Sequence, residues 1–155
     1  DLPPGTGDIQ LTLVQKIKLT GAVIVTTPQD LSHVDVKKGS DMFKKVDTPI
    51  IGVIENMVGT NISGRLSDVD ISRASLEINN KKINLDNKGN FNFVHNIFSG
   101  ESGLKESQRL GLPLLGQIPL DYNLSESCDL GIPYVTNNLD SIIKLEFSKI
   151  AEAIF

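Results

Sequence analysis

Cysteine is almost absent from this sequence, and several classes of site are excluded with it. Cys128 is the single cysteine among 155 residues. No disulfide can therefore form within the chain, and no zinc or iron–sulfur site can be built from several cysteines of one chain. Long apolar runs are also missing. Stretches such as 21–27 and 49–54 fall well short of the about 18 residues that a membrane-spanning helix needs, so we expect no membrane span.

An excess of positive charge is missing too. The 15 lysines and arginines stand against 19 aspartates and glutamates, which gives a net charge of −4. This balance argues against nonspecific nucleic-acid binding, which requires a basic face. It does not exclude a small phosphate-bearing ligand, because backbone amides and metal ions can hold phosphate without basic side chains.

The composition is that of one folded domain. Apolar residues make up 39% and charged residues 22%, which excludes an intrinsically disordered chain. The sequence does not begin with methionine, and we expect no signal or transit sequence within it. The chain opens on Asp1-Leu2-Pro3-Pro4, in the middle of a motif, so we expect it to be part of a longer protein.

Three continuous apolar runs predict strands that are buried on both faces. They cover residues 22–27, 49–54 and 112–118. Continuous rather than alternating apolar character is typical of parallel strands between two layers of helices. Residues 132–135 predict a further short edge strand.

Helical stretches separate these runs. We expect helices over 9–17, from about 30 to 46, over 101–110, and from about 140 to the end. Asp8 is a candidate N-cap for the first, Asp30 or Ser32 for the second, and Asn138 or Asp140 for the last, while Gly111 ends the third. Alternation of this kind predicts an α/β fold with right-handed crossovers.

The segment 58–96 differs in composition from the rest of the chain. It is rich in Asn, Ser, Asp and Lys. Residues 76–78 and 82–85 alternate with period two around Asn79-Asn80, which predicts a hairpin. A second turn at 87–90 precedes another short strand. We therefore expect a small polar β-meander inserted in the α/β domain.

The strongest chemical motif is the octapeptide Asp1-Leu2-Pro3-Pro4-Gly5-Thr6-Gly7-Asp8. An aspartate, a glycine-containing loop and a helix start together are typical of a phosphate and Mg²⁺ site. The carboxylate can bind the metal or its water, while the glycines and the helix N-terminus favour the anion. A simple turn into a capped helix is the plainer interpretation.

This octapeptide resembles the switch II region of the Mrp-type (ApbC-like) ATPases, within the deviant Walker-A P-loop ATPases that include nitrogenase iron protein and MinD. Further segments match in the family's order: 21–30, 35–43, 52–57 with its Glu-Asn-Met, 97–100, 112–121 and 129–133. The resemblance covers roughly 1–57 and 95–155. It implies a SIMIBI-type P-loop NTPase with a parallel sheet and helices on both faces, of which 1–155 is the C-terminal part.

For the phosphate side, the resemblance implies roles within the octapeptide. Asp1 would be the Walker-B carboxylate near Mg²⁺, and Pro4, Gly5 and Gly7 would form the loop that senses the γ-phosphate. Asp8 would lie near the attacking water, or would only cap the helix that follows.

For the base, the resemblance points to the ends of two strands. Asn56 would hydrogen-bond the adenine edge, since an amide offers both a donor and an acceptor. Pro119 and Asp121 would line the base pocket. The alternatives are a strand-ending turn for Asn56 and a Pro-x-Asp turn for the other two.

Two departures from the family pattern stand out. No Gly-Lys-[Ser/Thr] occurs in the chain, so these 155 residues alone are not expected to hydrolyse ATP. The family's Cys-x-x-Cys after Glu-Asn-Met is also missing, and 58–96 contains no thiol to bind a cluster. The remaining candidates are plainer: Cys128 is interpreted as a small buried hydrophobe and His33 as a solvated surface residue.

Taken with the resemblance, these observations predict an intact protein that binds ATP with Mg²⁺. It would act as an iron–sulfur cluster assembly or carrier ATPase, as a cytosolic homodimer that serves acceptor or assembly proteins. Three alternatives stay open: a cluster-free ATPase switch of the MinD or partitioning type, a non-enzymatic α/β interaction module, and an inactive paralogue.

Overall fold

A parallel sheet organises the body of the molecule. The computed structural model describes Leu2, residues 8–137 and residues 141–155. Within them, β1 (Ala22–Thr26), β2 (Ile50–Asn56) and β7 (Leu114–Ile118) pair in parallel in the order β1-β2-β7. These strands are the three predicted from apolar runs.

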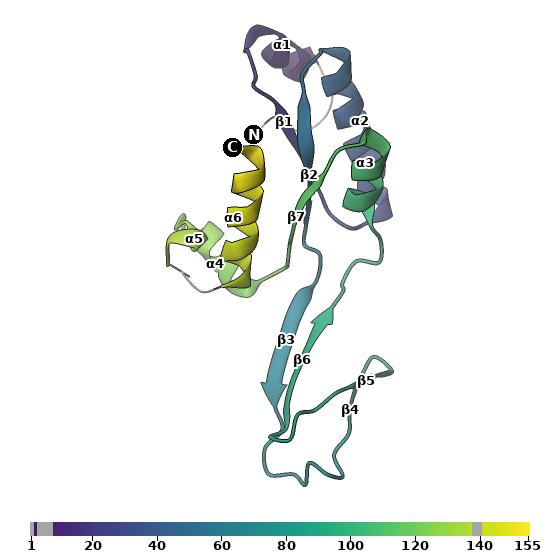
Figure 1. The fold of residues 1–155 in the computed structure, drawn as a ribbon, viewed down its shortest axis with the longest axis vertical. Coiled ribbons are helices and arrows are strands. Elements are labelled where there is room, and N and C mark those ends of the chain that lie inside the picture. Colours follow the sequence, from purple (N-terminus) through teal and green to yellow (C-terminus); the bar gives the residue numbers. More distant parts are fainter. Residues whose placement is uncertain (1, 3–7, 138–140) are drawn as a thin grey trace.

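Helices cover the sheet from both sides. α2 (Asp30–Lys45) and α3 (Ser102–Leu110) lie on one side and α6 (Ile142–Ile154) on the other, while α1 (Asp8–Lys16) precedes β1 (Figure 1). Gly116 lets α6 approach closely, because a Cβ at this position would lie 2.6 Å from the Ile150 side chain. The α/β fold with a parallel sheet between helices is therefore confirmed.

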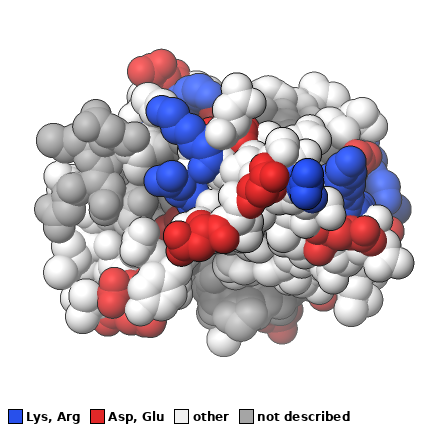
Figure 2. All heavy atoms as spheres, turned by 90° about the horizontal axis from the view of Figure 1, so that it is seen from below, with Lys and Arg blue, Asp and Glu red and all other residues white. Residues whose placement is uncertain are grey.

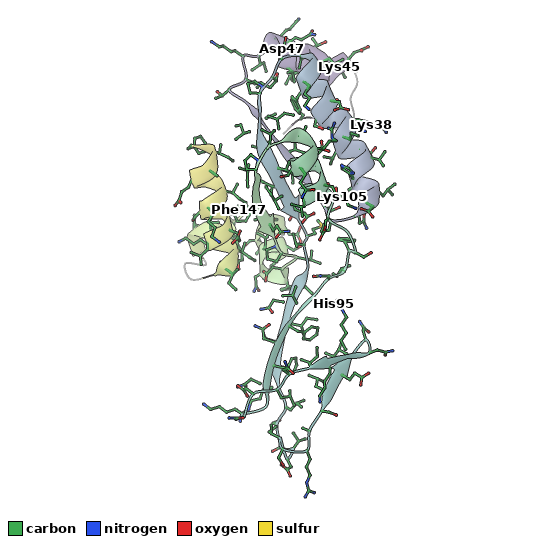
Figure 3. The ribbon with its side chains drawn as sticks, turned by 45° about the vertical axis from the view of Figure 1, so that its right-hand side comes forward. Lys38, Lys45, Asp47, His95, Lys105 and Phe147 are labelled. Carbon is green, nitrogen blue, oxygen red and sulfur yellow. The ribbon has the colours of Figure 1, made fainter. Side chains whose placement is uncertain are left out.

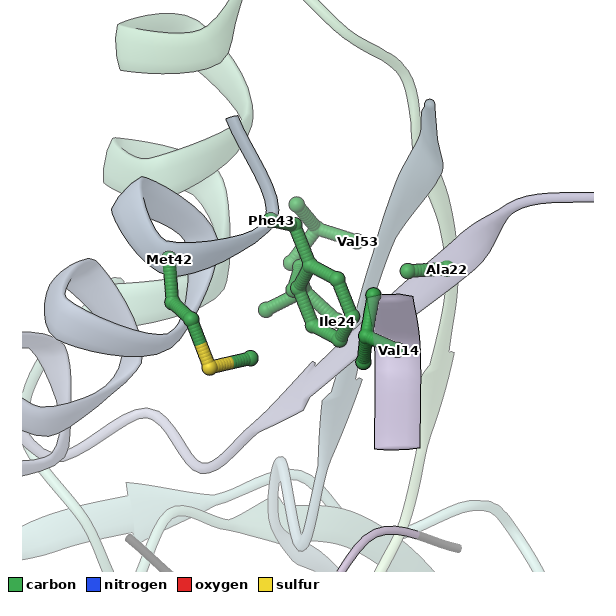
Figure 4. Packing of buried hydrophobic residues seen from close by; sticks show 6 residues of the cluster. All are labelled: Val14, Ala22, Ile24, Met42, Phe43 and Val53. Atoms are coloured by element: carbon green, nitrogen blue, oxygen red, sulfur yellow. The ribbon is translucent and has the colours of Figure 1, made fainter. Parts of the chain in front are cut away.

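The core lies between the sheet and α2. Phe43 and Met42 of α2 pack with residues of β1, β2 and α1 (Figure 4). Val53, in the central strand, is fully buried. The members of this cluster are Val14, Ala22, Ile24, Met42, Phe43 and Val53.

The segment 58–96 forms an extended arm that projects from the carboxyl end of the sheet (Figure 1). β3 (Thr60–Arg65) pairs antiparallel with β6 (Asn90–His95), and β4 (Leu76–Ile78) pairs with β5 (Lys81–Ile83) as a hairpin between them. The predicted hairpin and second turn are confirmed. The predicted meander is wrong, because β3 pairs with the last strand of the arm and not with the next.

Two short helices follow β7. α4 (Tyr122–Asp129) was not predicted, and α5 (Tyr134–Asn137) replaces the edge strand expected over 132–135. In α5 the backbone N–H and the hydroxyl of Thr136 both donate to the Pro133 carbonyl, at 3.2 and 2.7 Å. These local hydrogen bonds close a helical turn and override the β-branched sequence.

Two of the predicted helix caps are replaced by other residues, and the third candidate lies inside its helix. Gln29 precedes α2, and Asp30 lies inside its first turn. Ser141 caps α6 by accepting the Lys144 N–H, while Asn138 and Asp140 lie outside the described residues. α1 begins at Asp8, so this carboxylate belongs to the first turn.

Candidate functional site

The carboxyl ends of β2 and β7 bring the predicted base-binding residues side by side. In the parallel register Asn56 lies opposite Ile118, directly before the loop Pro119–Asp121. The Val58 N–H donates to the Ile118 carbonyl at 3.1 Å, and the Leu120 N–H to the Gly59 carbonyl at 2.6 Å. Ligands of open α/β sheets bind at this edge, so the geometry is that of a candidate binding site.

Asn56 combines a turn role with a free donor. Its Oδ1 accepts the Met57 N–H at 2.9 Å, and Met57 follows in the left-handed region at φ 61°. Among the described residues the amide nitrogen of Asn56 has no hydrogen-bond partner. The side chain is partly exposed, so this N–H pair is available to an acceptor on a ligand.

Pro119 and Asp121 line a groove of about 1000 Å³ between the base of the arm, β7 and α6. Asp121 Oδ1 also accepts the Leu124 N–H at 2.9 Å and thereby caps α4. Asn56 is not part of the groove lining. The loop thus faces the groove, and Asn56 stands beside it at the end of the neighbouring strand.

The residues predicted for the phosphate side are not placed. Asp1, Pro4, Gly5 and Gly7 lie outside the described residues. Asp8 is exposed on α1.

A buried carboxyl group at the same edge was missed by the sequence analysis. Glu55 is 2% exposed. Its Oε1 accepts the Gly103 N–H and its Oε2 accepts the Gln117 side-chain amide, both at 2.8 Å. Its position before Asn56, within a Glu-Asn-Met motif, was the available signal.

A second buried carboxyl group joins α2 to α3. Glu106 is fully buried and accepts hydrogen bonds from Ser40 and, at 2.7 and 2.8 Å, from Arg109. Desolvation on burial opposes ionisation, but hydrogen bonds from Arg109 and Ser40 together with the guanidinium charge lower the pKa of Glu106 to about 2. His33 Nε2 lies 3.1 Å from Glu106. The prediction that His33 is a solvated surface residue is therefore wrong.

Metal and cluster ligands do not gather in the described part of the chain. No group of three or more His, Cys, Asp or Glu side chains there is arranged to hold a metal ion. Cys128 is exposed on α4, and its interpretation as a buried hydrophobe is wrong. None of the helices in the described ranges is long and apolar enough to cross a bilayer.

Charged side chains do not form a one-sign patch on the face shown in Figure 2, where lysines and arginines alternate with acidic groups. Lys38 and Lys45 point outward from α2, and His95 lies where the arm joins the body (Figure 3). The lysines of α2 are exposed, as expected for a solvated helix face.

A family model described as ParA, NUBPL iron-transfer P-loop NTPase, matches residues 1–71 and 78–155. The chain belongs to this family. The match confirms the resemblance to the Mrp-type P-loop ATPases. It also extends beyond the predicted limits, because only residues 72–77 of the arm are left unmatched.

Several relatives of this chain are named as iron–sulfur cluster carrier or transfer proteins. An iron–sulfur cluster carrier protein of Aquifex aeolicus is 38% identical over 99% of this chain and 35% of its own length. The iron–sulfur cluster transfer protein NUBPL of Dictyostelium discoideum is 36% identical over 91% of this chain and 36% of its own length. The chain thus spans about a third of the length of these curated relatives.

A solved structure supports the same fold. A nucleotide-binding protein of Archaeoglobus fulgidus, in complex with ADP, matches with a TM-score of 0.54 and 30% identity. The match covers 84% of this chain and 43% of that protein.

Proposed function

We propose that the protein containing this chain is an ATP-binding iron–sulfur cluster carrier, and that this chain supplies the base-binding edge of its NTPase domain. The observation that carries the proposal is the register of β2 against β7, which sets Asn56 beside the Pro119–Asp121 loop. Membership of an iron-transfer NTPase family and the names of the relatives support the activity.

Different residues of the chain would bind the base and the phosphates of the nucleotide. The free amide N–H of Asn56 would donate to a ring nitrogen of the base, while its Oδ1 stays on the Met57 N–H. Pro119 and Asp121 would form the other wall. On the phosphate side we propose Asp1 for Mg²⁺, with Pro4, Gly5 and Gly7 around the phosphates and Asp8 near the attacking water, as the resemblance to the family implies.

The cluster would be cargo, and its ligands would lie outside the arm. Residues 58–96 contain no cysteine, and Cys128 is a single thiol. A cluster bridging two subunits needs about four thiolates, so two copies of this chain offer too few. We further propose a homodimer that delivers clusters to acceptor proteins in the cytosol.

A second candidate function is a cluster-free ATPase switch of the MinD or partitioning type. The observation that favours it is the absence of the Cys-x-x-Cys from a chain that matches the family model over 1–71 and 78–155. Both candidates require the same nucleotide edge, so the test of Asn56 applies to both.

Replacing Asn56 separates its two roles. In the full-length protein that carries this chain, Asn56→Asp keeps the oxygen that accepts the Met57 N–H and removes the donor. We expect ATP affinity, measured by calorimetry with Mg²⁺, to fall by about 1–3 kcal/mol, roughly 5- to 150-fold, because a buried base edge loses its partner. Asn84→Ala, on the exposed arm, is the control. Unchanged affinity in a folded Asn56→Asp protein would mean that Asn56 is only a turn residue.

A further inference from the structure

Glu55 occupies a buried junction between β2, β7 and α3. It lies at the carboxyl end of the central strand β2, one residue before Asn56, and is 2% exposed. Its two carboxyl oxygens are both engaged, one by the Gly103 N–H of α3 and the other by the Gln117 amide of β7, each at 2.8 Å. One buried side chain thus joins three elements.

The start of α3 depends on this junction for its backbone hydrogen bonds. Glu101, at the N-cap position, makes no side-chain cap. Acceptors outside the helix satisfy its first N–H groups instead: Ser102 N–H donates to the carbonyl of Pro28, in the loop after β1, at 3.3 Å, and Gly103 N–H donates to Glu55. A carboxyl group at a helix N-terminus is also favoured by the helix dipole.

Close packing at the junction leaves no room for a side chain at Gly103. A Cβ on Gly103 would lie 2.8 Å from the Glu55 Cβ. The fully buried Ser102 hydroxyl lies 3.1 Å from that of Thr26, at the end of β1. The N-terminus of α3 is therefore held against the ends of all three strands of the sheet.

Both limbs of the arm meet at this point. The chain enters the arm through Met57, two residues after Glu55. We call the segment 96–101, which connects β6 to α3, the returning limb, and 57–59 the outgoing limb. The limbs touch one another, since a Cβ on Gly59 would lie 2.8 Å from Asn96 Oδ1. The end of β2 thus lies next to both limbs.

We propose that Glu55 is a positioning residue that couples the occupancy of the base site at Asn56 to the orientation of the arm. The coupling rests on the proposed nucleotide function. Glu55 acts through its neighbours and does not touch the nucleotide. Ordering of Asn56 by the base fixes the end of β2, and Glu55 passes this restraint to α3 and to the limb 96–101.

Two substitutions of similar size test the junction itself. Glu55→Leu fills the same space and removes both acceptors. Glu55→Gln keeps an oxygen for the Gly103 N–H, and its amide can donate to a reoriented Gln117. By amide hydrogen exchange of the folded full-length protein, we expect Gly103 to exchange roughly tenfold faster in Glu55→Leu and near the wild-type rate in Glu55→Gln, because one hydrogen bond to a buried group is lost. Equal protection in Glu55→Leu and wild type overturns the proposal.

Gln117→Leu serves as a second variant should Glu55→Leu not fold. It removes one hydrogen-bond partner of Glu55 and is expected to speed exchange at 96–101. No change in exchange there would also overturn the proposal.

The change in amide exchange on nucleotide binding distinguishes coupling from a merely structural role of Glu55. A non-hydrolysable ATP analogue with Mg²⁺ is expected to slow exchange at 96–101 about threefold or more in wild type and Glu55→Gln, with no slowing in Glu55→Leu. Binding of the analogue without any change at 96–101 in wild type overturns the coupling. Absence of analogue binding in wild type overturns the proposed function, and the Gly103 comparison still decides whether Glu55 holds α3.

Discussion

Glu106 illustrates how a single charged side chain is held inside the helix layer. A buried carboxylate is stable only when its hydrogen bonds replace those of water. Ser40 and Arg109 provide them, and Arg109 is itself oriented by Asp41 at 2.9 Å. The sequence could not reveal this cluster, because its partners on α2 lie more than 60 residues away. His33 was mispredicted for the same reason.

The lowered pKa of Glu106 predicts that the stability of the fold depends on pH. Its pKa falls from 4.5 in the unfolded chain to about 2 in the fold. A lowered folded-state pKa means that the stabilisation is fully present above pH 4.5 and is lost as the pH falls toward 2, with a span of roughly 3 kcal/mol. We expect Glu106→Gln to lower the free energy of unfolding at pH 7, and the difference from wild type to shrink below pH 4.5. Urea unfolding from pH 7 to 3 measures this.

The control for this prediction is Glu77→Gln on the exposed strand β4, which should leave the stability and its pH profile unchanged. A constant difference between wild type and Glu106→Gln across that range would contradict the account.

At the scale of elements, apolar patterning was sufficient for the sheet and insufficient for the helices after it. The three parallel strands follow from continuous apolar runs, and the end of α3 follows from Gly111. α4 was missed because it has no buried residue and hence no apolar stripe. The Asp121 cap, and not core packing, begins that helix. The topology of the arm was missed because the pairing of β3 with β6 is set by long-range contacts.

Alanine is expected to change the stability of the fold in opposite directions at two glycines, one inside α2 and one after α3. Gly111 ends α3 at φ 68°, and Gly39 lies inside α2; a Cβ at either would meet no atom within 4 Å. Gly111→Ala should destabilise the fold by about 1 kcal/mol, because alanine is strained in the left-handed region. Gly39→Ala should stabilise it by roughly 0.5–1 kcal/mol. Chemical denaturation of both variants gives the comparison, and a shift of the same sign in both would refute the backbone argument.

At the scale of the whole molecule, sheet topology builds the candidate site, and membership of the family supports the proposed function. The resemblance placed Asn56, Pro119 and Asp121 in one site, and the register of β2 and β7 brings them together. That they bind a base remains a proposal. The Glu-Asn-Met motif pointed to Glu55, but its burial and its contact with Gly103 could not be predicted, because they depend on the path of the arm. The chain spans about a third of the length of its relatives, so the carrier activity is proposed for the protein that contains it.

The central claim is that this longer protein carries iron–sulfur clusters without ligands from the arm. The direct measurement is iron and acid-labile sulfide bound per protein after reconstitution, before and after mixing with an apo-acceptor in the presence of ATP and Mg²⁺. It is made on the full-length protein and on a variant whose residues 61–94 are replaced by a short turn. We predict that both bind clusters and that the wild type delivers them to the acceptor. A wild type that binds no cluster would contradict the carrier function, and loss of the cluster in the shortened variant alone would contradict the exclusion of the arm.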